Sequence, residues 1–285
     1  MTLATLLRAE GTIAAPGAYD AYSARIIAQA GFPLAYLSGL ANEASDLGYP
    51  DLGLTTASEL IRRASNIARV VDVPVVCDAD TGFGGLGNLT RTVREFEAAG
   101  VSAIHLEDQT FPKRCGALPG KEVVSATAFE RVLRQALQAR RNRDFLIIAR
   151  TDAKHAEGLD GVIKRLLAYQ RAGADAVMTG DFYSAEEYQQ ITAALDVPLF
   201  ACAADPAHFD VQANFSMAQW QELGVKVVIY WYLPLFAASA AVYAAVQELR
   251  DTGLAAGGAT AVHSYREYAH TVELESWLAL EDDEP

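Results

Sequence analysis

Positive charge is in short supply in this chain. Its 285 residues contain 23 Lys and Arg against 36 Asp and Glu, which gives a formal net charge of −13. Nucleic acids and anionic membrane surfaces are recognised mainly through basic side chains. The composition therefore argues against both as partners.

Cysteine and long apolar runs are also scarce. Cys77, Cys115 and Cys202 lie far apart without a CxxC pair, which excludes a disulfide framework and fits a reducing, cytoplasmic compartment. The N-terminus lacks the apolar core of a signal peptide. The longest apolar stretch, residues 225–246, is interrupted by Pro234, so we expect a strand followed by a helix and no membrane span.

What the chain does contain is a regular alternation of strands and helices. Expected strands cover residues 12–17, 34–39, 73–80, 102–107, 145–152, 174–179, 197–201 and 225–230. Expected helices cover residues 21–30, 56–70, 88–99, 127–140, 161–171, 185–194 and 216–223, with a last long helix from about 234. This pattern predicts one (β/α)8 TIM-type barrel over residues 1–285. A doubly wound sheet is the rival, but no Gly-x-Gly-x-x-Gly follows the first strand.

The loop at residues 111–121 places a thiol beside two cations. Cys115 follows Lys113 and Arg114 directly, and Gly and Pro residues surround them. Neighbouring cations favour a thiolate, so we expect a lowered pKa for Cys115. A small buried hydrophobe is the ordinary role of a lone cysteine, but loop composition favours a chemical role here.

Acidic side chains follow two neighbouring strands. Asp78 and Asp80 end the third expected strand, and Glu107 ends the fourth. The carboxyl ends of barrel strands meet at one face, where the three carboxylates would repel one another and take up protons. Each acid alone has a helix cap or a turn as its ordinary role. Together they predict a site for Mg²⁺, with Mn²⁺ as a substitute.

Arg150 ends the fifth expected strand at the same face. Its guanidinium is suited to a carboxylate, while Ser38 and Gly39 offer a hydroxyl and backbone N–H groups to a carboxylate or oxyanion. Tyr36 is a candidate base, with core packing as its alternative role. This combination predicts a small 2-oxo or 2-hydroxy carboxylic acid as substrate.

Several short segments resemble the isocitrate lyase and phosphoenolpyruvate mutase superfamily, above all its 2-methylisocitrate lyase-type enzymes. The matching segments are Tyr36-Leu37-Ser38-Gly39, Asp51-Leu52-Gly53, Asp78-Ala79-Asp80-Thr81-Gly82-Phe83-Gly84, His105-Leu106-Glu107-Asp108-Gln109, Lys113-Arg114-Cys115-Gly116 and Ala149-Arg150-Thr151-Asp152-Ala153. They lie in the first half of the chain and are specific as a set.

The resemblance implies a tetramer in which the last helix swaps between subunits, so that residues 234–285 take part in oligomer contacts. It implies Mg²⁺ near Asp78, Asp80 and Glu107, and a loop at residues 113–116 that closes over the substrate. The residues that it places in catalysis are Cys115, Arg150, Tyr36, Lys113 and Arg114, with Cys115 as the proton donor. The residues that it places at the substrate are Ser38, Gly39, Asp51, Gly116 and Arg150. Relatives that transfer phosphoryl groups lack the loop cysteine, so Cys115 favours the C–C lyase branch.

The second half of the expected site departs from the family pattern. Ala117 stands where lyases carry His, and Gly180, with Asp181 one place later, stands where the sixth strand usually ends in Glu. The seventh strand ends Cys202-Ala203-Ala204-Asp205, and the eighth is followed by Trp231-Tyr232-Leu233-Pro234 without the expected Arg. The part of the pocket that holds the distal end of the substrate is therefore expected to be more apolar.

Three functions remain open from the sequence. The first is a Mg²⁺-dependent lyase that cleaves a C–C bond of a small 2-hydroxy or 2-oxo carboxylic acid through a metal-stabilised enolate. The second is a 2-oxo-acid decarboxylase of the oxaloacetate type. The third is a catalytically silent barrel that acts as a binding subunit.

Overall fold

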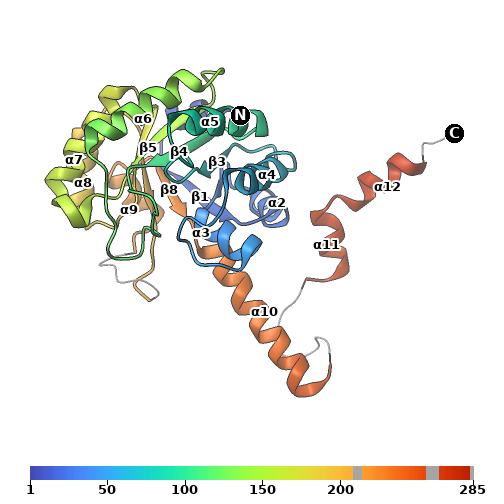
Figure 1. The fold of residues 1–285 in the computed structure, drawn as a ribbon. Helices are drawn as coiled ribbons and strands as arrows, with labels where there is room; N and C mark the ends of the chain where they lie inside the picture. The colour runs from blue at the N-terminus through green and yellow to red at the C-terminus, as the bar shows by residue number, and fades with distance from the viewer. Residues whose placement is uncertain (208–213, 255–262, 283–285) are drawn as a thin grey trace.

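In a computed structural model, which describes residues 1–207, 214–254 and 263–282, the chain forms a closed barrel of eight parallel strands in the order β1 to β8 (Figure 1). The strands are β1 (Ile13–Ala18), β2 (Ala35–Leu37), β3 (Val75–Asp78), β4 (Ala103–Glu107), β5 (Leu146–Thr151), β6 (Ala176–Thr179), β7 (Leu199–Cys202) and β8 (Val227–Tyr230). Pairing of β1 with β8 closes the barrel. The predicted TIM-type fold is confirmed.

Helices surround the barrel because each crossover buries one apolar face against the strands. The helices between strands are α2 (Ala21–Gln29), α3 (Gly39–Asn42), α4 (Ala57–Ala68), α5 (Leu86–Ala99), α6 (Ala126–Ala139), α7 (Lys154–Ala172), α8 (Ala185–Ala194) and α9 (Met217–Glu222). Asp20 and Thr56 cap α2 and α4 with capping boxes. Helix α7 begins seven residues earlier than the expected residue 161, across a break at Gly158 with φ of 64°.

Two short elements escape prediction from the sequence. Helix α1 (Leu3–Arg8) has only six residues, and a π-helical segment, Glu43–Leu47, follows α3 where we expect a loop. The carboxylate of Glu43 is buried and accepts backbone N–H groups from Leu52, Leu54 and Thr55. This side chain therefore folds the β2–α4 connection back onto the barrel mouth.

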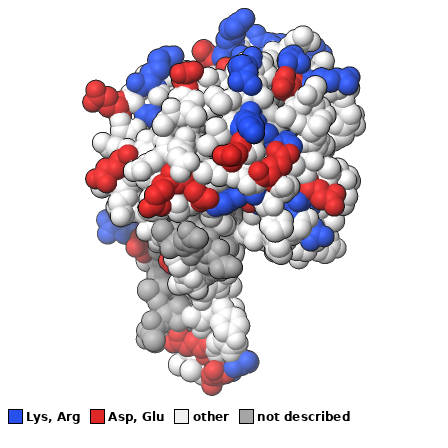
Figure 2. All heavy atoms as spheres, turned by 90° about the vertical axis from the view of Figure 1, so that its left-hand side faces the viewer, with Lys and Arg blue, Asp and Glu red and all other residues white. Residues whose placement is uncertain are grey.

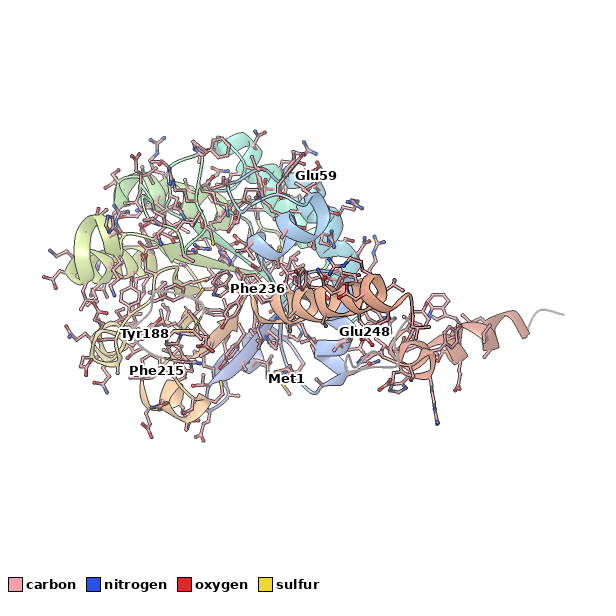
Figure 3. The ribbon with its side chains drawn as sticks, turned by 90° about the horizontal axis from the view of Figure 1, so that it is seen from below. Met1, Glu59, Tyr188, Phe215, Phe236 and Glu248 are labelled. Carbon is pink, nitrogen blue, oxygen red and sulfur yellow. The ribbon has the colours of Figure 1, made fainter. Side chains whose placement is uncertain are left out.

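The C-terminal helices leave the barrel. Helix α10 (Leu233–Thr252) projects away from it, and α11 (Tyr265–Thr271) and α12 (Leu274–Asp282) follow (Figure 1). No residue of α10 is buried. Seen from below, Phe236 lies at the barrel end of α10 and Glu248 farther out (Figure 3). Within the described residues, no helix is both long enough and apolar enough to cross a membrane.

Charge is distributed unevenly between the barrel and α10. On the face shown in Figure 2, acidic and basic side chains are interspersed over the barrel, while the projecting part carries charge mainly at its tip. The sequence of α10 agrees, since its charged residues are Glu248, Arg250 and Asp251 near its end. The stem of α10 is therefore an apolar surface.

Candidate active site

A small cavity lies at the carboxyl ends of the strands. The residues that line it are Tyr36, Ser38, Asp78, Cys115, Gly116, Ala117, Arg150, Gly180, Phe182, Cys202 and Trp231. Its lining includes the charged side chains of Asp78 and Arg150 and the apolar side chains of Ala117, Phe182, Cys202 and Trp231. Positions 117, 180, 202 and 231, which depart from the family pattern, all line this cavity.

The three expected metal ligands are buried at this barrel mouth, but cations separate them. Asp78, Asp80 and Glu107 are at most 6% exposed. Nη1 of Arg150 lies 3.2 Å from Glu107 Oε2 and 4.0 Å from Asp78 Oδ2, and Nζ of Lys113 lies 2.8 Å from Asp80 Oδ1. The two cations thus offset part of the repulsion that the sequence predicts.

The proton affinities of the acids diverge. Burial opposes ionisation of Asp78, but His105, Lys113 and Arg150 lower its pKa to about 2. Burial and the charges of Asp78 and Asp51 raise the pKa of Asp80 to about 7, although Lys113 acts in the opposite direction. Burial also raises the pKa of Glu107 well above its usual value. The carboxylates therefore share fewer than three negative charges, as expected for closely spaced acids.

Glu107 supplies a test of the expected cation site. Neither of its buried oxygens accepts a hydrogen bond from the residues that the structure describes, and such an oxygen suits a divalent cation. No ready-made group of three His, Cys, Asp or Glu ligands occurs in residues 1–207, 214–254 and 263–282. Mg²⁺ keeps several waters and needs only one or two carboxylates directly. The residues present therefore fit a water-rich Mg²⁺ site.

Lys113 is bound to acids rather than exposed. Its ammonium forms ion pairs with Asp51 and Asp80, and its side chain is 2% exposed. Burial alone would lower the pKa of Lys113, but Asp80, Asp51 and Glu107 raise it well above its ordinary value. Asp51 also accepts the backbone N–H of Cys115 through its carbonyl. Asp51 and Lys113 thus hold the loop and are not among the residues that line the cavity.

The expected thiolate at Cys115 is wrong. Cys115 is only 7% exposed, and burial, followed by the charge of Asp51, raises its pKa to about 12. The ammonium of Lys113 already forms ion pairs with carboxylates, so its positive charge does not offset this rise in the pKa of Cys115. A protonated thiol is nonetheless the form that a proton donor needs. The loop thus covers the cavity with an S–H group.

Arg114 is not brought to the cavity. Its side chain is exposed, and Nη1 contacts the carbonyl of Pro119 at 3.5 Å. Its backbone is held instead, because the side chain of Gln109 accepts the N–H of Arg114 and donates to its carbonyl, both at 2.9 Å. Gln109 is therefore a loop-positioning residue that the sequence analysis missed.

Ser38 lines the cavity, but Gly39 does not. Ser38 Oγ caps α3 by accepting the N–H of Ala41 at 3.4 Å. The N–H of Gly39 donates to Asp78 Oδ2 at 3.3 Å, so this expected oxyanion donor is already engaged. A Cβ at position 39 would lie 2.8 Å from that oxygen, which explains the need for glycine.

Asp152 holds the guanidinium of Arg150 through two hydrogen bonds. Its Nε donates to Asp152 Oδ2 at 2.8 Å and its Nη2 to Oδ1 at 3.0 Å. A Cβ on Gly180 would lie 2.5 Å from Nε of Arg150 and would overlap Asp152 Oδ1. The missing side chain at position 180 therefore makes room for this pair, which leaves Nη1 of Arg150 directed toward Glu107.

The phenol of Tyr36 contacts His105, which the sequence singled out only as part of a motif. The phenol lies 2.7 Å from Nε2 of His105, which is fully buried. Burial lowers the pKa of His105 to about 4 and raises that of Tyr36 well above its usual value. The pair is therefore neutral at physiological pH, and Tyr36 presents a phenol rather than a phenolate to the cavity.

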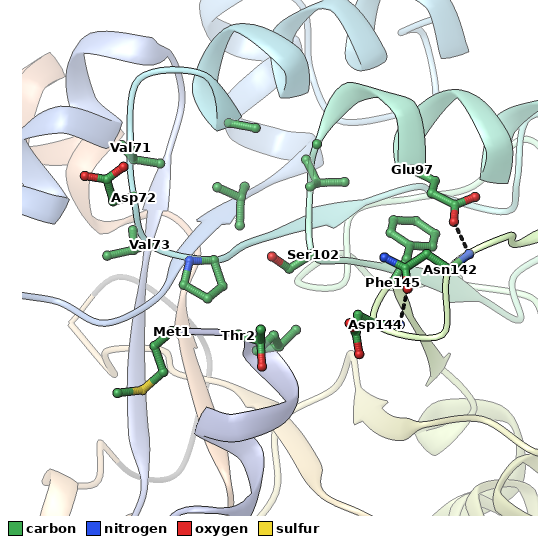
Figure 4. A pocket seen from close by; sticks show the side chains of 16 residues that line it. Met1, Thr2, Val71, Asp72, Val73, Glu97, Ser102, Asn142, Asp144 and Phe145 are labelled. Carbon is green, nitrogen blue, oxygen red and sulfur yellow. Dashed lines mark hydrogen bonds between the residues drawn. The ribbon is translucent and has the colours of Figure 1, made fainter.

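Further hollows lie outside this cavity. One of about 680 Å³ reaches Asp80, Glu107 and Lys113 from the side of α5 and α6. Another, of about 380 Å³, lies at the amino ends of β3 to β5 and is lined by Met1, Thr2 and Phe145 among others (Figure 4). That end of a barrel serves stability, and none of the expected catalytic residues lines it.

Comparison with known proteins identifies the family. The sequence profile of the phosphoenolpyruvate phosphomutase family matches residues 3–250. The chain belongs to this family. A probable 2-methylisocitrate lyase 2 of Corynebacterium glutamicum is 44% identical over 84% of this chain and 76% of its own length. The 2,3-dimethylmalate lyase of Eubacterium barkeri is 37% identical over 97% of this chain and 94% of its own length.

Solved structures of the same superfamily agree. Oxaloacetate acetylhydrolase bound to the inhibitor 3,3-difluorooxalacetate matches with a TM-score of 0.92 and 32% identity, covering 99% of this chain and 95% of that one. Phosphonopyruvate hydrolase in complex with oxalate and Mg²⁺ matches with a TM-score of 0.86 and 30% identity, covering 99% of both chains. The two curated relatives are named as lyases, the family as a phosphomutase and these two solved structures as hydrolases, and enzymes of the superfamily are Mg²⁺-dependent. The family resemblance is confirmed.

Proposed function

We propose that this chain is a Mg²⁺-dependent lyase that cleaves a C–C bond of a small 2-hydroxy or 2-oxo carboxylic acid. One observation carries the proposal: the Cys115 thiol lines the same cavity as the charged groups of Asp78 and Arg150 and several apolar side chains. Named relatives include a probable 2-methylisocitrate lyase and a 2,3-dimethylmalate lyase, which supports this reaction class.

Asp78, Asp80 and Glu107 would hold the cation. Bound Mg²⁺, or Mn²⁺ in its place, would supply a Lewis acid that offsets negative charge on the substrate oxygens. Arg150 adds a fixed positive charge to the same cavity, 3.2 Å from Glu107. These groups favour a carboxylate and an adjacent oxygen in the part of the cavity beside Arg150.

Cys115 would supply the proton. When the bond breaks, its electron pair stays on the departing carbon. The substrate hydroxyl becomes a carbonyl and passes its proton to the Tyr36 phenol, which gives its own proton to Nε2 of His105. The buried thiol keeps its proton, since burial raises the pKa of Cys115 to about 12, and can deliver it to that carbon. Tyr36 lines the same cavity and is placed to hydrogen-bond the substrate oxygen.

The apolar side chains of the cavity favour a substrate without a third carboxylate. Ala117, Phe182, Cys202 and Trp231 offer no charged group to a third carboxylate. Burying an unpaired carboxylate against them would cost several kcal/mol. We therefore expect alkyl-substituted malates to be better substrates than 2-methylisocitrate.

A decarboxylase acting on a smaller 2-oxo acid is the second candidate. The small cavity, with about 30 Å³ of free volume, favours it. A Mg²⁺-dependent assay comparing oxaloacetate, 2,3-dimethylmalate and 2-methylisocitrate separates the candidates. Cleavage of a hydroxy acid to a 2-oxo acid supports the lyase, and CO₂ with pyruvate from oxaloacetate supports the decarboxylase. No turnover of any substrate with saturating Mg²⁺ would favour a silent binding barrel.

We also propose that α10 packs against a second copy within a cytoplasmic homotetramer. Exposed apolar residues along the helix include Leu233, Phe236, Val242, Tyr243, Val246 and Leu249. Such a surface is costly to leave in water. Sedimentation of the wild type and of Val242→Asp tests this, with a shift to smaller species expected for the variant and an unchanged tetramer contradicting it.

A further inference from the structure

Lys121 is a buried cation that the proposed reaction leaves without a role. Its side chain is 3% exposed. Its ammonium donates to the carbonyl of Gly116 at 2.6 Å and to Asp181 Oδ1 at 2.5 Å, and it lies 3.3 Å from Asp152 Oδ1. An ammonium has three donors, so these three acceptors use all of them.

These contacts join the loop to two strand ends. Gly116 belongs to the segment that covers the cavity, while Asp152 follows β5 and Asp181 lies two residues after the end of β6. The loop sits close to the barrel here, because a Cβ on Gly116 would lie 2.7 Å from the carbonyl of Gly180 and 2.9 Å from Nη2 of Arg150. Lys121 therefore fixes the main chain next to Cys115.

The closed arrangement has to open for a substrate to enter. About 30 Å³ of free volume holds roughly two water molecules, whereas small-molecule sites are usually several hundred Å³. Cys115 and Gly116 form part of the cavity lining. A substrate that enters past this segment separates the Gly116 carbonyl from the ammonium of Lys121.

We propose that Lys121 is a positioning residue whose ammonium holds the Cys115–Gly116 segment closed by tying the Gly116 carbonyl to Asp152 and Asp181. Opening breaks a buried, charge-assisted hydrogen bond at Gly116, which keeps the open population small. In the closed state the same hydrogen bond fixes the position of the Cys115 thiol relative to Arg150. Lys121 thus governs both access to Cys115 and its alignment.

The unusual glycine at position 180 makes this arrangement possible. Without a side chain there, the Asp152 carboxylate reaches both Arg150 and Lys121. Asp181 is oriented by accepting the backbone N–H of Lys154 at 3.2 Å through its other oxygen. Position 180 therefore carries no acid of its own, and Asp152 and Asp181 bind the loop lysine.

Alkylation of Cys115 by iodoacetamide tests the proposal without requiring enzyme activity. Lys121→Met and Asp181→Asn are compared with the wild type and with Lys164→Met, a control at an exposed position of α7. Peptide mapping, with Cys115→Ser as reference, assigns the reacting thiol. We expect alkylation of Cys115 to be about tenfold faster in both test variants and unchanged in the control.

The two test variants guard against a folding defect. Asp181 is partly exposed, so Asp181→Asn is expected to fold even if Lys121→Met does not. Lys121→Arg keeps the charge and should restore most of the protection. Wild-type alkylation rates in a folded Asp181→Asn, judged by circular dichroism, would overturn the proposal, as would equal rates in Lys121→Arg and a folded Lys121→Met.

A kinetic experiment extends the test and rests on the proposed lyase function. Misalignment of the thiol should lower kcat of Lys121→Met by about tenfold or more, with a smaller change in KM. Unchanged kcat would overturn the alignment role. If the wild type turns over no substrate, the proposed function fails while the alkylation result still decides the role of Lys121.

Discussion

Asp152 occupies the space that a side chain at position 180 would need. Its Oδ2 accepts Nε of Arg150 at 2.8 Å, and a Cβ on Gly180 would come within 2.5 Å of that same Nε. The two positions lie on neighbouring strand ends, so the Asp152–Arg150 pair fits only because position 180 carries no side chain.

Filling position 180 should destabilise the protein. Gly180→Ala forces Asp152 and Arg150 apart, and overpacking of this kind costs about 1–3 kcal/mol. Urea unfolding measures the loss. Gly87→Ala is the matched control, because a Cβ at this position in α5 meets nothing within 4 Å and alanine favours a helix. A Gly180→Ala variant as stable as the control would contradict the tight packing.

Replacing the proton donor should separate chemistry from binding. Cys115→Ser is expected to lower kcat by about 10²–10⁴-fold, because a hydroxyl is a far weaker acid than a thiol. The cavity wall keeps its shape, so KM should change much less. Steady-state assays with the best substrate measure both constants. Cys202→Ser, at the other end of the cavity, should retain most of the activity, and equal losses in both variants would contradict the assignment.

The reactivity of Cys115 should depend on pH in an unusual way. Burial raises its pKa to about 12 from an ordinary value of about 8.5. The folded protein therefore keeps a proton that the unfolded chain loses, and this contribution to stability falls as the pH rises through that window. Alkylation of Cys115 should keep accelerating above pH 9. A plateau near pH 8.5 would show an exposed, ordinary thiol.

Loss of a carboxylate at the barrel mouth should weaken cation binding. Glu107→Gln and Asp80→Asn are each expected to reduce affinity for Mn²⁺ by about tenfold or more, since oxygen charge governs binding of hard cations. Electron paramagnetic resonance of free Mn²⁺ measures this directly. Asp144→Asn, at the opposite end of the barrel, is the control. Equal affinities in all three variants would remove these acids from the site.

The fold follows from patterns that are local in the sequence. Apolar strand runs, the capping residues Asp20 and Thr56, and helix-ending glycines such as Gly100 each act within a few residues. Once the barrel closes, the strand ends must converge. The meeting of Tyr36, Asp78 and Arg150 at one cavity was therefore predictable.

The electrostatics of the site were not predictable, because they depend on partners distant in sequence. Lys113 lies two residues from Cys115, yet its ammonium pairs with Asp51, which is 62 residues away in the sequence. Lys121 finds Asp181, 60 residues away. Sequence neighbours indicate which charges are present, whereas burial decides which of them act on the thiol. By contrast, the hydrogen bond between Gln109 and Arg114, which holds the loop, joins residues close in sequence, so the sequence held a clue to it.

The aromatic run after β8 has a mechanical consequence. Trp231 is part of the cavity lining, and its ring contacts that of Tyr232, whose ring in turn contacts Phe236 on the first turn of α10. Helix α10, twenty residues long, is thus joined through edge-to-face ring contacts to the cavity. A partner subunit bound along α10, as proposed above, would therefore press on the same aromatic rings that shape the substrate site.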